Sequence, residues 1–263
     1  MTYETIRYHE EHGVGWVTLD RPEVHHAFNQ PMQDELSGLW QSLRSNDDVR
    51  CVVLTASGDT AFCTGIDRAD IPADGETVFD PYLWDDPGDK LGPKSNGCFT
   101  PVIAAVNGMA CAGAFYLLGQ VEFIIAADHV TFFDPHVTFG MAAIYEPTVM
   151  VPRMPYGEIA RLTLLGSHER MSAQRAHAIG LVSEVVPAAE LHEAARWAAE
   201  AIASQPARPL RTTVEALWRA RQLGERAALD GAPALLHVGT SPEALAEGEA
   251  TFRSGGRITP RVR

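Results

Sequence analysis

Short apolar runs and amphipathic segments alternate along the first half of the chain. Three runs are buried-looking and end in turn residues, which predicts strands: "RCVVLTASG" (50–58), "PVIAAVNG" (101–108) and "EFIIAAD" (122–128). The segment 31–47 instead carries its apolar residues at helical spacing, at Met32, Leu36, Leu39, Trp40 and Leu43. Helical "AGAFYLLGQ" (112–120) lies between the second and third runs. Strands separated by helices favour parallel pairing and an α/β fold.

The two ends of the chain follow other patterns. Residues 6–20, "IRYHEEHGVGWVTLD", predict two strands around a glycine-containing turn, a hairpin. After about residue 156 the pattern becomes mainly helical, with only "LVSEVV" strand-like, and four segments carry it: 156–166, 172–180, 188–204 and 208–224. We therefore expect a core over 1–190 and a helical C-terminal subdomain over 191–263 that serves oligomerisation.

A long insert follows the first predicted parallel strand. Residues 72–97 are rich in Pro, Gly and Asp and contain Phe79, Tyr82 and Trp84. An irregular segment of this length with aromatic residues is either a loop that covers a substrate or a packed surface loop.

Charge and cysteine content exclude several classes of partner. The 263 residues carry a formal net charge of −13, which disfavours nucleic acid or an anionic membrane but not a small anionic ligand. Cys51, Cys63, Cys98 and Cys111 are dispersed without a CxxC pair, so neither a metal site nor disulfides are indicated. The N-terminus lacks the pattern of a signal peptide, and no stretch is long and apolar enough to span a bilayer. We expect a cytoplasmic protein with reduced cysteines.

Candidate chemistry lies where small residues follow a strand. The segments "AFCTGIDRADI" (61–71) and "AVNGMACAGAFYLLGQ" (105–120) both place glycines at a predicted turn. Backbone N–H groups at such turns lack intrahelical acceptors, and two that converge would stabilise a developing oxyanion. The alternative is that the glycines only permit close packing of helix on strand.

Several motifs occur together in an order that resembles the crotonase (enoyl-CoA hydratase/isomerase) superfamily. They are "LDRPEVHHAFN" (19–29), "AFCTGID" (61–67), "PVIAAVNGMACAGA" (101–114), "SAQRAHAIGLVSEVVP" (172–187) and "SPEALAEGEATFRSGGR" (241–257). The resemblance implies a crotonase-type fold of repeated ββα units with a helical C-terminal region, assembled as a homotrimer or hexamer. It also implies an acyl-CoA thioester as the ligand, so coenzyme A is part of the substrate and no separate cofactor is expected.

The resemblance also implies a layout for the site. The thioester carbonyl would be held by the N–H groups of Ile66 and Gly113. The coenzyme A moiety would lie along two segments, mostly through their backbone groups: Val24, His25 and Ala27, and Cys63, Gly65 and Asp67. Asp67 has an alternative role in fixing the turn, and His25 either contacts phosphate or lies on the surface.

Hydratases of this superfamily carry two glutamates that this chain lacks. The resemblance aligns them with Tyr116 in "GAFY" and His136 in "FFDPHVTFG". Water addition to an enoyl thioester needs a general base and a general acid, and the loss of one typically costs about 10²–10⁴ in rate. Ordinary hydratase activity is therefore doubtful on sequence grounds.

Four side chains are candidates to replace the glutamates. His136 exchanges protons near neutral pH, and Asp134 would share its face in an extended segment or would instead cap a turn before Pro135. Tyr116 either hydrogen-bonds substrate or packs on its helix face. Glu146 lies ten residues after His136, in the later region from which some relatives supply an acid.

Two functional hypotheses follow. The first is an acyl-CoA enzyme that stabilises a thioester enolate and catalyses isomerisation or C–C hydrolysis. The second is an acyl-CoA binding protein that has kept the carbonyl site and lost catalysis.

Overall fold

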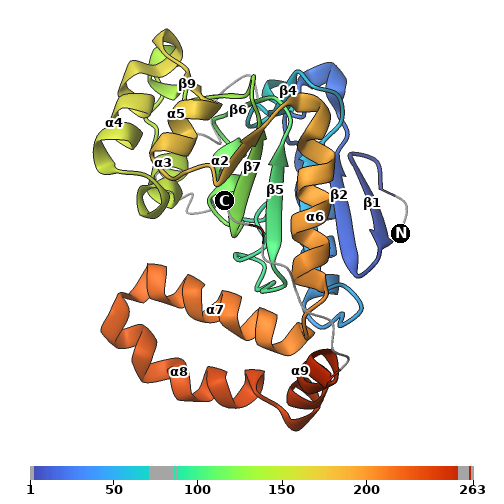
Figure 1. The fold of residues 1–263 in the computed structure, drawn as a ribbon. Coiled ribbons are helices and arrows are strands. Elements are labelled where there is room, and N and C mark those ends of the chain that lie inside the picture. The colour runs from blue at the N-terminus through green and yellow to red at the C-terminus, as the bar shows by residue number, and fades with distance from the viewer. Residues whose placement is uncertain (1–2, 71–85, 87, 254–260, 262–263) are drawn as a thin grey trace.

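The computed structural model describes residues 3–70, 86, 88–253 and 261, and it shows an α/β fold with two sheets (Figure 1). The larger sheet has the strand order β1-β2-β3-β5-β7-β10. Its strands are β1 (Ile6–Glu11), β2 (Val14–Leu19), β3 (Cys51–Ala56), β5 (Val102–Val106), β7 (Phe123–Ala127) and β10 (Glu184–Val186). β1 and β2 form the predicted hairpin, and every other pair of neighbours is parallel. The predicted parallel pairing is confirmed.

A second, smaller sheet has the order β4-β6-β8-β9, and the hydrophobic pattern did not reveal it. It consists of β4 (Ala61–Cys63), β6 (Met109–Cys111), β8 (Thr131–Phe133) and β9 (Met171–Ser172). Strands of two or three residues are too short to show a period. β5, β6 and α2 (Ala114–Leu118) follow one another as a ββα unit with one strand in each sheet. The expected fold of ββα units is confirmed.

Helix α1 (Gln30–Leu43) forms where the sequence predicts it. Asn29 caps it by accepting a hydrogen bond from the Met32 N–H at 3.1 Å. All five predicted apolar residues are buried, and the Trp40 indole donates to the Leu91 carbonyl at 2.8 Å. The helix thereby joins the main core to the described end of the 72–97 insert.

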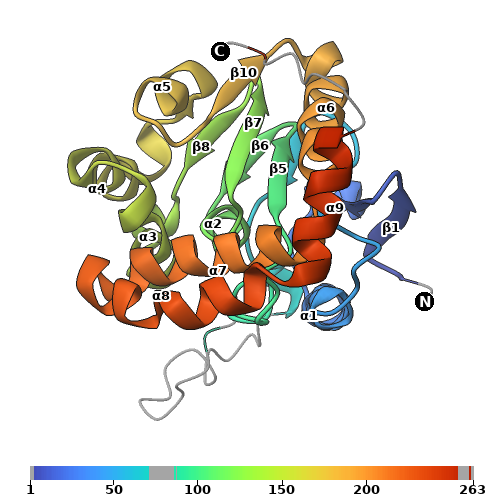
Figure 2. The same ribbon diagram turned by 60° about the horizontal axis from the view of Figure 1, so that its bottom comes forward.

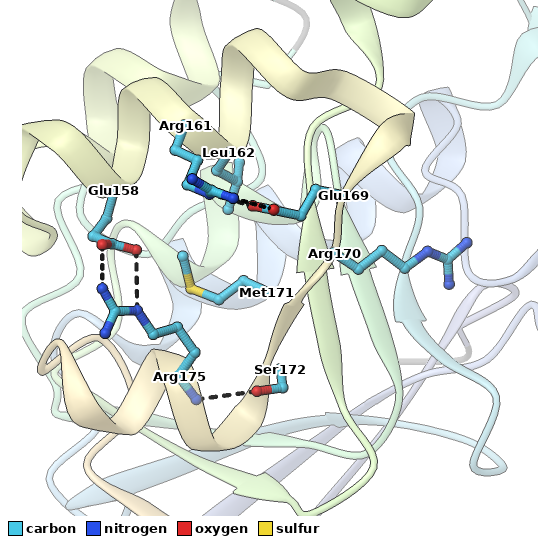
Figure 3. Close-up of a pocket in the computed structure, with 8 residues that line it drawn as sticks. All are labelled: Glu158, Arg161, Leu162, Glu169, Arg170, Met171, Ser172 and Arg175. Atoms are coloured by element: carbon cyan, nitrogen blue, oxygen red, sulfur yellow. Dashed lines mark hydrogen bonds and ion pairs between the residues drawn. The ribbon is translucent and has the colours of Figure 1, made fainter.

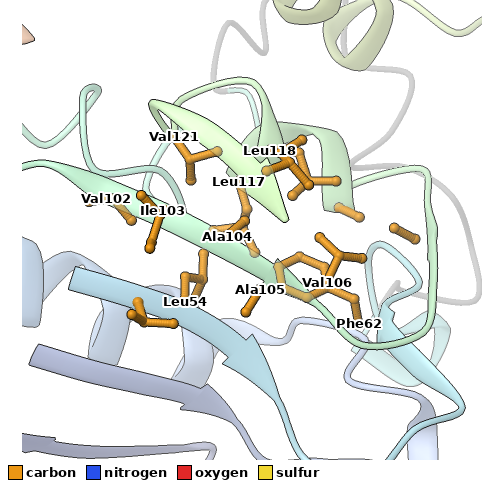
Figure 4. Packing of buried hydrophobic residues seen from close by; sticks show 14 of the residues in the cluster. Leu54, Phe62, Val102, Ile103, Ala104, Ala105, Val106, Leu117, Leu118 and Val121 are labelled. Atoms are coloured by element: carbon orange, nitrogen blue, oxygen red, sulfur yellow. The ribbon is translucent and has the colours of Figure 1, made fainter. Parts of the chain in front are cut away.

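The core lies between β3, β5 and α2 (Figure 4). Leu54 of β3 packs near the small residues of β5, and Leu117 and Leu118 of α2 cover β5 from the other side. Each of these leucines is at most 1% exposed, and burying such a side chain contributes about 1.5–3 kcal/mol. The short helix α2 is therefore held rigidly, which matters because Gly113 precedes it directly.

The remaining helices form two groups (Figure 1). α3 (Tyr145–Met150), α4 (Tyr156–Leu165) and α5 (Ala173–Ala178) gather beside the smaller sheet. α6 (Leu191–Ala203) packs on the larger sheet. α7 (Ala207–Leu223) and α8 (Glu225–Gly239) pack side by side, with α9 (Pro242–Arg253) against α7 (Figure 2). Short 3-10 turns complete the chain: η1 (Pro22–Val24), η2 (Arg68–Asp70), η3 (His136–Phe139), η4 (Val151–Arg153), η5 (Gly166–His168) and η6 (Ala188–Glu190).

Some sequence predictions concern parts that the structure does not test. The aromatic residues Phe79, Tyr82 and Trp84 of the insert lie outside the described residues. The boundary between 190 and 191 stays a prediction, although α6 shares the core of the larger sheet. All four cysteines are buried and free. Among the helices that the structure describes, none has the length and apolar character to cross a membrane.

Candidate active site

Two glycine-containing loops touch at the carboxyl ends of β4 and β6. A Cβ atom on Gly65 would lie 2.9 Å from the Ala112 Cβ and 3.1 Å from the Gly113 nitrogen. Gly65 also has a φ of +94°, and Ala112 has a φ of +49°, a value that non-glycine residues rarely adopt. Only small residues allow this contact between the loops. The glycine permits close packing of loop on loop, and this contact brings the two predicted N–H groups into neighbouring loops.

Phe28 pairs with the first loop in a way that leaves the Ile66 amide free. The Phe28 N–H donates to the Gly65 carbonyl, and the Asp67 N–H donates to the Phe28 carbonyl, both at 2.8 Å. Since alternate residues of an extended segment point in opposite directions, the N–H of Ile66 faces away from Phe28. Within the described part of the chain, neither the Ile66 N–H nor the Gly113 N–H donates a hydrogen bond.

The Phe28 ring supports the second loop as well. A Cβ on Gly113 would lie 2.3 Å from the Phe28 Cε1 atom, so the ring occupies the place of a side chain there. Phe28 is only 2% exposed. One residue thus positions both free N–H groups, the first through its backbone and the second through its ring.

His136 is held by Asp134. The imidazole Nδ1–H donates to the Asp134 Oδ1 at 2.5 Å, and the same oxygen accepts the His136 backbone N–H at 3.0 Å. The segment is not extended as the shared-face argument assumed, because Pro135 has φ −86° and ψ −5° and η3 begins at His136. The imidazole pair and the turn cap, which were alternatives in the sequence, therefore occur together. The hydrogen bond to Asp134 raises the pKa of His136 above its ordinary value of 6.5.

Glu146 approaches the other side of the same imidazole. Its Oε1 lies 3.6 Å from the His136 Nε2, and the two side chains are 10% and 18% exposed. Burial raises the pKa of the Glu146 carboxyl. The second Asp134 oxygen, Oδ2, is buried and has no hydrogen-bond partner among the described residues. His136 thus stands between two carboxyl groups that few water molecules can reach.

Tyr116 connects these groups to the glycine loops. It is 3% exposed and packs edge to face on Phe28 with ring centroids 6.5 Å apart. Its hydroxyl is hydrogen-bonded to Asp86, and burial raises the Tyr116 pKa far above its ordinary value, with a smaller contribution from the charge of Glu146. The packing role and a hydrogen bond are both present, and the hydrogen bond is made to the protein. Gly113, Phe28, Tyr116, Glu146 and His136 therefore form one continuous neighbourhood.

The residues that the resemblance assigns to coenzyme A lie in two adjacent loops. Val24 ends η1, and His25 is exposed with a φ of +54°. The Thr64 hydroxyl donates to the His25 carbonyl at 3.3 Å, which joins the loops. Cys63 is fully buried, and this burial raises its thiol pKa to about 12. Their contacts with coenzyme A stay a prediction.

Two residues of this site were not singled out in the sequence. Phe28 lies within the first motif, but no local pattern there indicates its contacts with the two loops. Arg21, in "DRP", donates to Asp67 across 46 residues of sequence, at 2.8 Å. No local pattern reveals a pairing of that separation.

A separate pocket of about 460 Å³ lies between α4 and α5 (Figure 3). Its walls carry two arginine–glutamate pairs, Arg161 with Glu169 and Arg175 with Glu158. Arg170 points away from both pairs. None of the eight described lining residues belongs to the predicted site. Among the described residues, no group of histidine, cysteine and acidic side chains is arranged to hold a metal ion.

Comparisons with known proteins show the family to which the chain belongs. The family model for enoyl-CoA hydratase/isomerase matches residues 9–254. The chain is 34% identical over 213 residues to (E)-benzylidenesuccinyl-CoA hydratase of Thauera aromatica, covering 81% of this chain and 80% of that protein. It is 32% identical over 216 residues to 1,2-epoxyphenylacetyl-CoA isomerase of Escherichia coli, covering 77% and 78%.

Solved structures extend the likeness to the whole chain. A crystal structure of an enoyl-CoA hydratase/isomerase from Mycobacterium paratuberculosis superposes with a TM-score of 0.84 at 30% identity, covering 97% of each chain. An enoyl-CoA hydratase from Mycobacterium marinum gives 0.82 at 25% identity, covering 95% and 96%. The chain therefore belongs to the enoyl-CoA hydratase/isomerase family of the crotonase superfamily.

Proposed function

We propose that this protein is an acyl-CoA enzyme that adds water at the β-carbon of its thioester substrate. The N–H groups of Ile66 and Gly113 hold the thioester oxygen, and His136 activates the water. The observation that carries the proposal is the imidazole held by Asp134 with Glu146 at 3.6 Å from its free nitrogen. Coenzyme A enters as part of the substrate, and no further cofactor takes part.

The arrangement around His136 suits water activation. Because Nδ1 donates to Asp134, the neutral imidazole presents Nε2 as an acceptor. A separation of 3.6 Å between Nε2 and the Glu146 oxygen is too long for a direct hydrogen bond, yet one water can contact both atoms. His136 then takes the proton of that water, and a protonated Glu146 returns a proton to the α-carbon. The raised pKa of Glu146 favours its protonated form in this role.

The negative charge that develops during the reaction lies on the thioester carbonyl oxygen. On a β-keto thioester, the activated water attacks the β-carbonyl carbon and the bond between the α- and β-carbons breaks. The bonding pair forms the thioester enolate, whose oxygen accepts from Ile66 and Gly113, and protonation at the α-carbon releases acyl-CoA and a carboxylic acid. We propose this C–C hydrolysis as the reaction, and one positioned donor typically contributes about 3 kcal/mol to such a step.

The C-terminal helices support the proposal of a homotrimer or hexamer. Leucines on α7, α8 and α9 are more than half exposed at Leu217, Leu223, Leu229, Leu236 and Leu245. Exposed apolar side chains that recur over neighbouring helices are typical of a surface that another protein covers.

The test is turnover in water labelled with ¹⁸O. The purified protein is incubated with β-keto thioesters and trans-2-enoyl-CoAs of several lengths, and the masses of the products are measured by mass spectrometry. We expect labelled carboxylic acid from the β-keto substrates. Labelled 3-hydroxyacyl-CoA instead would show hydration despite the missing glutamates, and unlabelled turnover would show isomerisation. A raised melting temperature with acyl-CoA but no turnover would leave the non-catalytic binding protein as the better hypothesis.

A further inference from the structure

A buried ion pair, Arg21–Asp67, contacts the loop that carries the Ile66 N–H. The Arg21 guanidinium donates to the Asp67 Oδ2 at 2.8 Å and to the Ala27 carbonyl at 2.6 Å. The two charged side chains are only 16% and 12% exposed. Arg21 thus contacts both strands of the short Phe28–Ile66 bridge, one through a carboxylate and the other through a carbonyl.

Asp67 makes two further hydrogen bonds, and Gly65 accepts one on the other side of Ile66 in the sequence. Its Oδ1 accepts from the Ala69 N–H at 3.1 Å, and its own N–H donates to the Phe28 carbonyl at 2.8 Å. On the other side of Ile66, the Gly65 carbonyl accepts from the Phe28 N–H. The residues on both sides of Ile66 are therefore fixed, whereas its own N–H donates no hydrogen bond within the described part of the chain. Such an arrangement orients one amide without occupying it.

Arg21 is itself held in place by His26. The His26 Nδ1 accepts from the Arg21 N–H at 3.0 Å, and Nε2 donates to the Ser57 carbonyl at 2.9 Å. The ring is 2% exposed, and burial lowers its pKa, so it stays neutral and keeps this pattern of one acceptor and one donor. The guanidinium therefore starts from a rigid backbone rather than from a mobile loop.

We propose that the Arg21–Asp67 ion pair is a positioning device that sets the direction of the Ile66 N–H toward a thioester carbonyl. The proposal rests on the carbonyl-binding role given to Ile66 in the proposed function. An amide donor must point at the developing charge to stabilise it, and a misplacement of about 1 Å can cost roughly 10²-fold in rate. Arg21 and Asp67 contact no reacting atom and act through the backbone between them.

The experiment measures carbonyl polarisation directly. Butyryl-CoA labelled with ¹³C at the carbonyl carbon is saturated, so it binds without undergoing water addition at the β-carbon. Isotope-edited infrared spectra report the frequency of its C=O stretch when bound. We expect a shift to lower frequency on the wild-type protein and a loss of most of that shift with Arg21→Met or Asp67→Asn. The dissociation constant should change by less than about threefold, because the rest of the coenzyme A path is unchanged.

A neighbouring ion pair provides a matched control. Arg7 pairs with Asp20, the residue before Arg21, at 2.9 Å. The Arg7 and Asp20 side chains are 62% and 32% exposed, and neither is hydrogen-bonded to Asp67 within the described residues. Arg7→Met should keep the full carbonyl shift. Arg21→Lys keeps the charge and loses the second donor, so it should recover only part of the shift, and it also serves if Arg21→Met fails to fold.

Three results would overturn the inference in different ways. A full shift in folded Arg21→Met, Asp67→Asn and Arg21→Lys would show that the pair does not position Ile66, while the carbonyl site stands. No shift on the wild-type protein would refute the carbonyl site and with it the proposed function. An equal loss in Arg7→Met would show a general loosening of the first motif and would refute a specific role for Arg21.

Discussion

The donor half and the proton-transfer half of the proposed site are built from different parts of the chain. The donor half uses backbone N–H groups of Ile66 and Gly113, with Gly65 small enough for the loops to touch. The proton-transfer half uses side chains of His136, Asp134 and Glu146. The resemblance to the family implies that the donor half keeps the family's motifs, and it aligns the two expected glutamates with Tyr116 and His136.

This difference shows which part of the function follows from the fold alone. Backbone donors follow from strand ends and loop contacts, so a chain that folds in this way acquires them with the fold. Proton carriers depend on single side chains, which can change without disturbing the sheets. The family therefore predicts the carbonyl site better than it predicts the reaction.

The comparison is tested most strongly at His136. His136→Ala removes the proposed base and should lower kcat by about 10²–10⁴-fold. Because the donor half is untouched, acyl-CoA affinity measured by calorimetry should stay within about threefold of wild type. Retained turnover would place the base elsewhere, and lost affinity would contradict the separation of the two halves.

The next largest effect is expected in the donor half. Gly113→Ala adds a Cβ whose place is 2.3 Å from the Phe28 ring, so the Gly113 N–H must shift. We expect a fall in kcat of about 10²–10³-fold, the range found when one donor is lost. Steady-state kinetics give the value.

A second substitution serves as its control. Phe28→Leu combined with Gly113→Ala removes the ring edge and should restore part of the rate. The backbone at Gly113 is ordinary αR, so the added methyl group brings no backbone strain. Its place also lies 3.1 Å from the Gly65 Cα, which is why only part of the rate should return. No recovery in the double variant would mean that Phe28 does not set the position of the donor.

Asp134→Asn tests the proton-transfer half through the pH dependence of kcat/KM. The hydrogen bond to Asp134 is the main cause of the raised His136 pKa, so the base form of wild type appears only as pH rises through a value above 6.5. In the variant the acidic limb of kcat/KM should move to lower pH. The rate at its plateau should fall by about 10–100-fold, because the ring loses its orientation. An unmoved limb would assign it to another group.

The smallest effect is expected at Tyr116. Its hydroxyl is bonded to Asp86, so Tyr116→Phe should cost about 1 kcal/mol of stability and change the rate by less than about fivefold. Thermal unfolding and kinetics measure both. A hundredfold loss of rate would show that the hydroxyl contacts substrate, and the division of roles within this half would need revision.

Much of the fold was predictable because its determinants are local. The three apolar runs became β3, β5 and β7, and the helical spacing at residues 31–47 became α1 with the same buried face. The smaller sheet was not predictable from periodicity, since its strands have only two or three residues. Strands of that length form because they hydrogen-bond to strands elsewhere in the chain, and local propensity does not define them.

The sequence by itself determined the family, the two glycine loops and the identity of the four candidate side chains, because these are statements about residue types at given positions. Only the tertiary structure decided which of them meet. It placed Asp134 and Glu146 on the two nitrogens of His136, turned the Tyr116 hydroxyl to Asp86, and joined Arg21 to Asp67. Contacts between residues far apart in sequence depend on how the sheets bring strand ends together, and no local pattern contains that information.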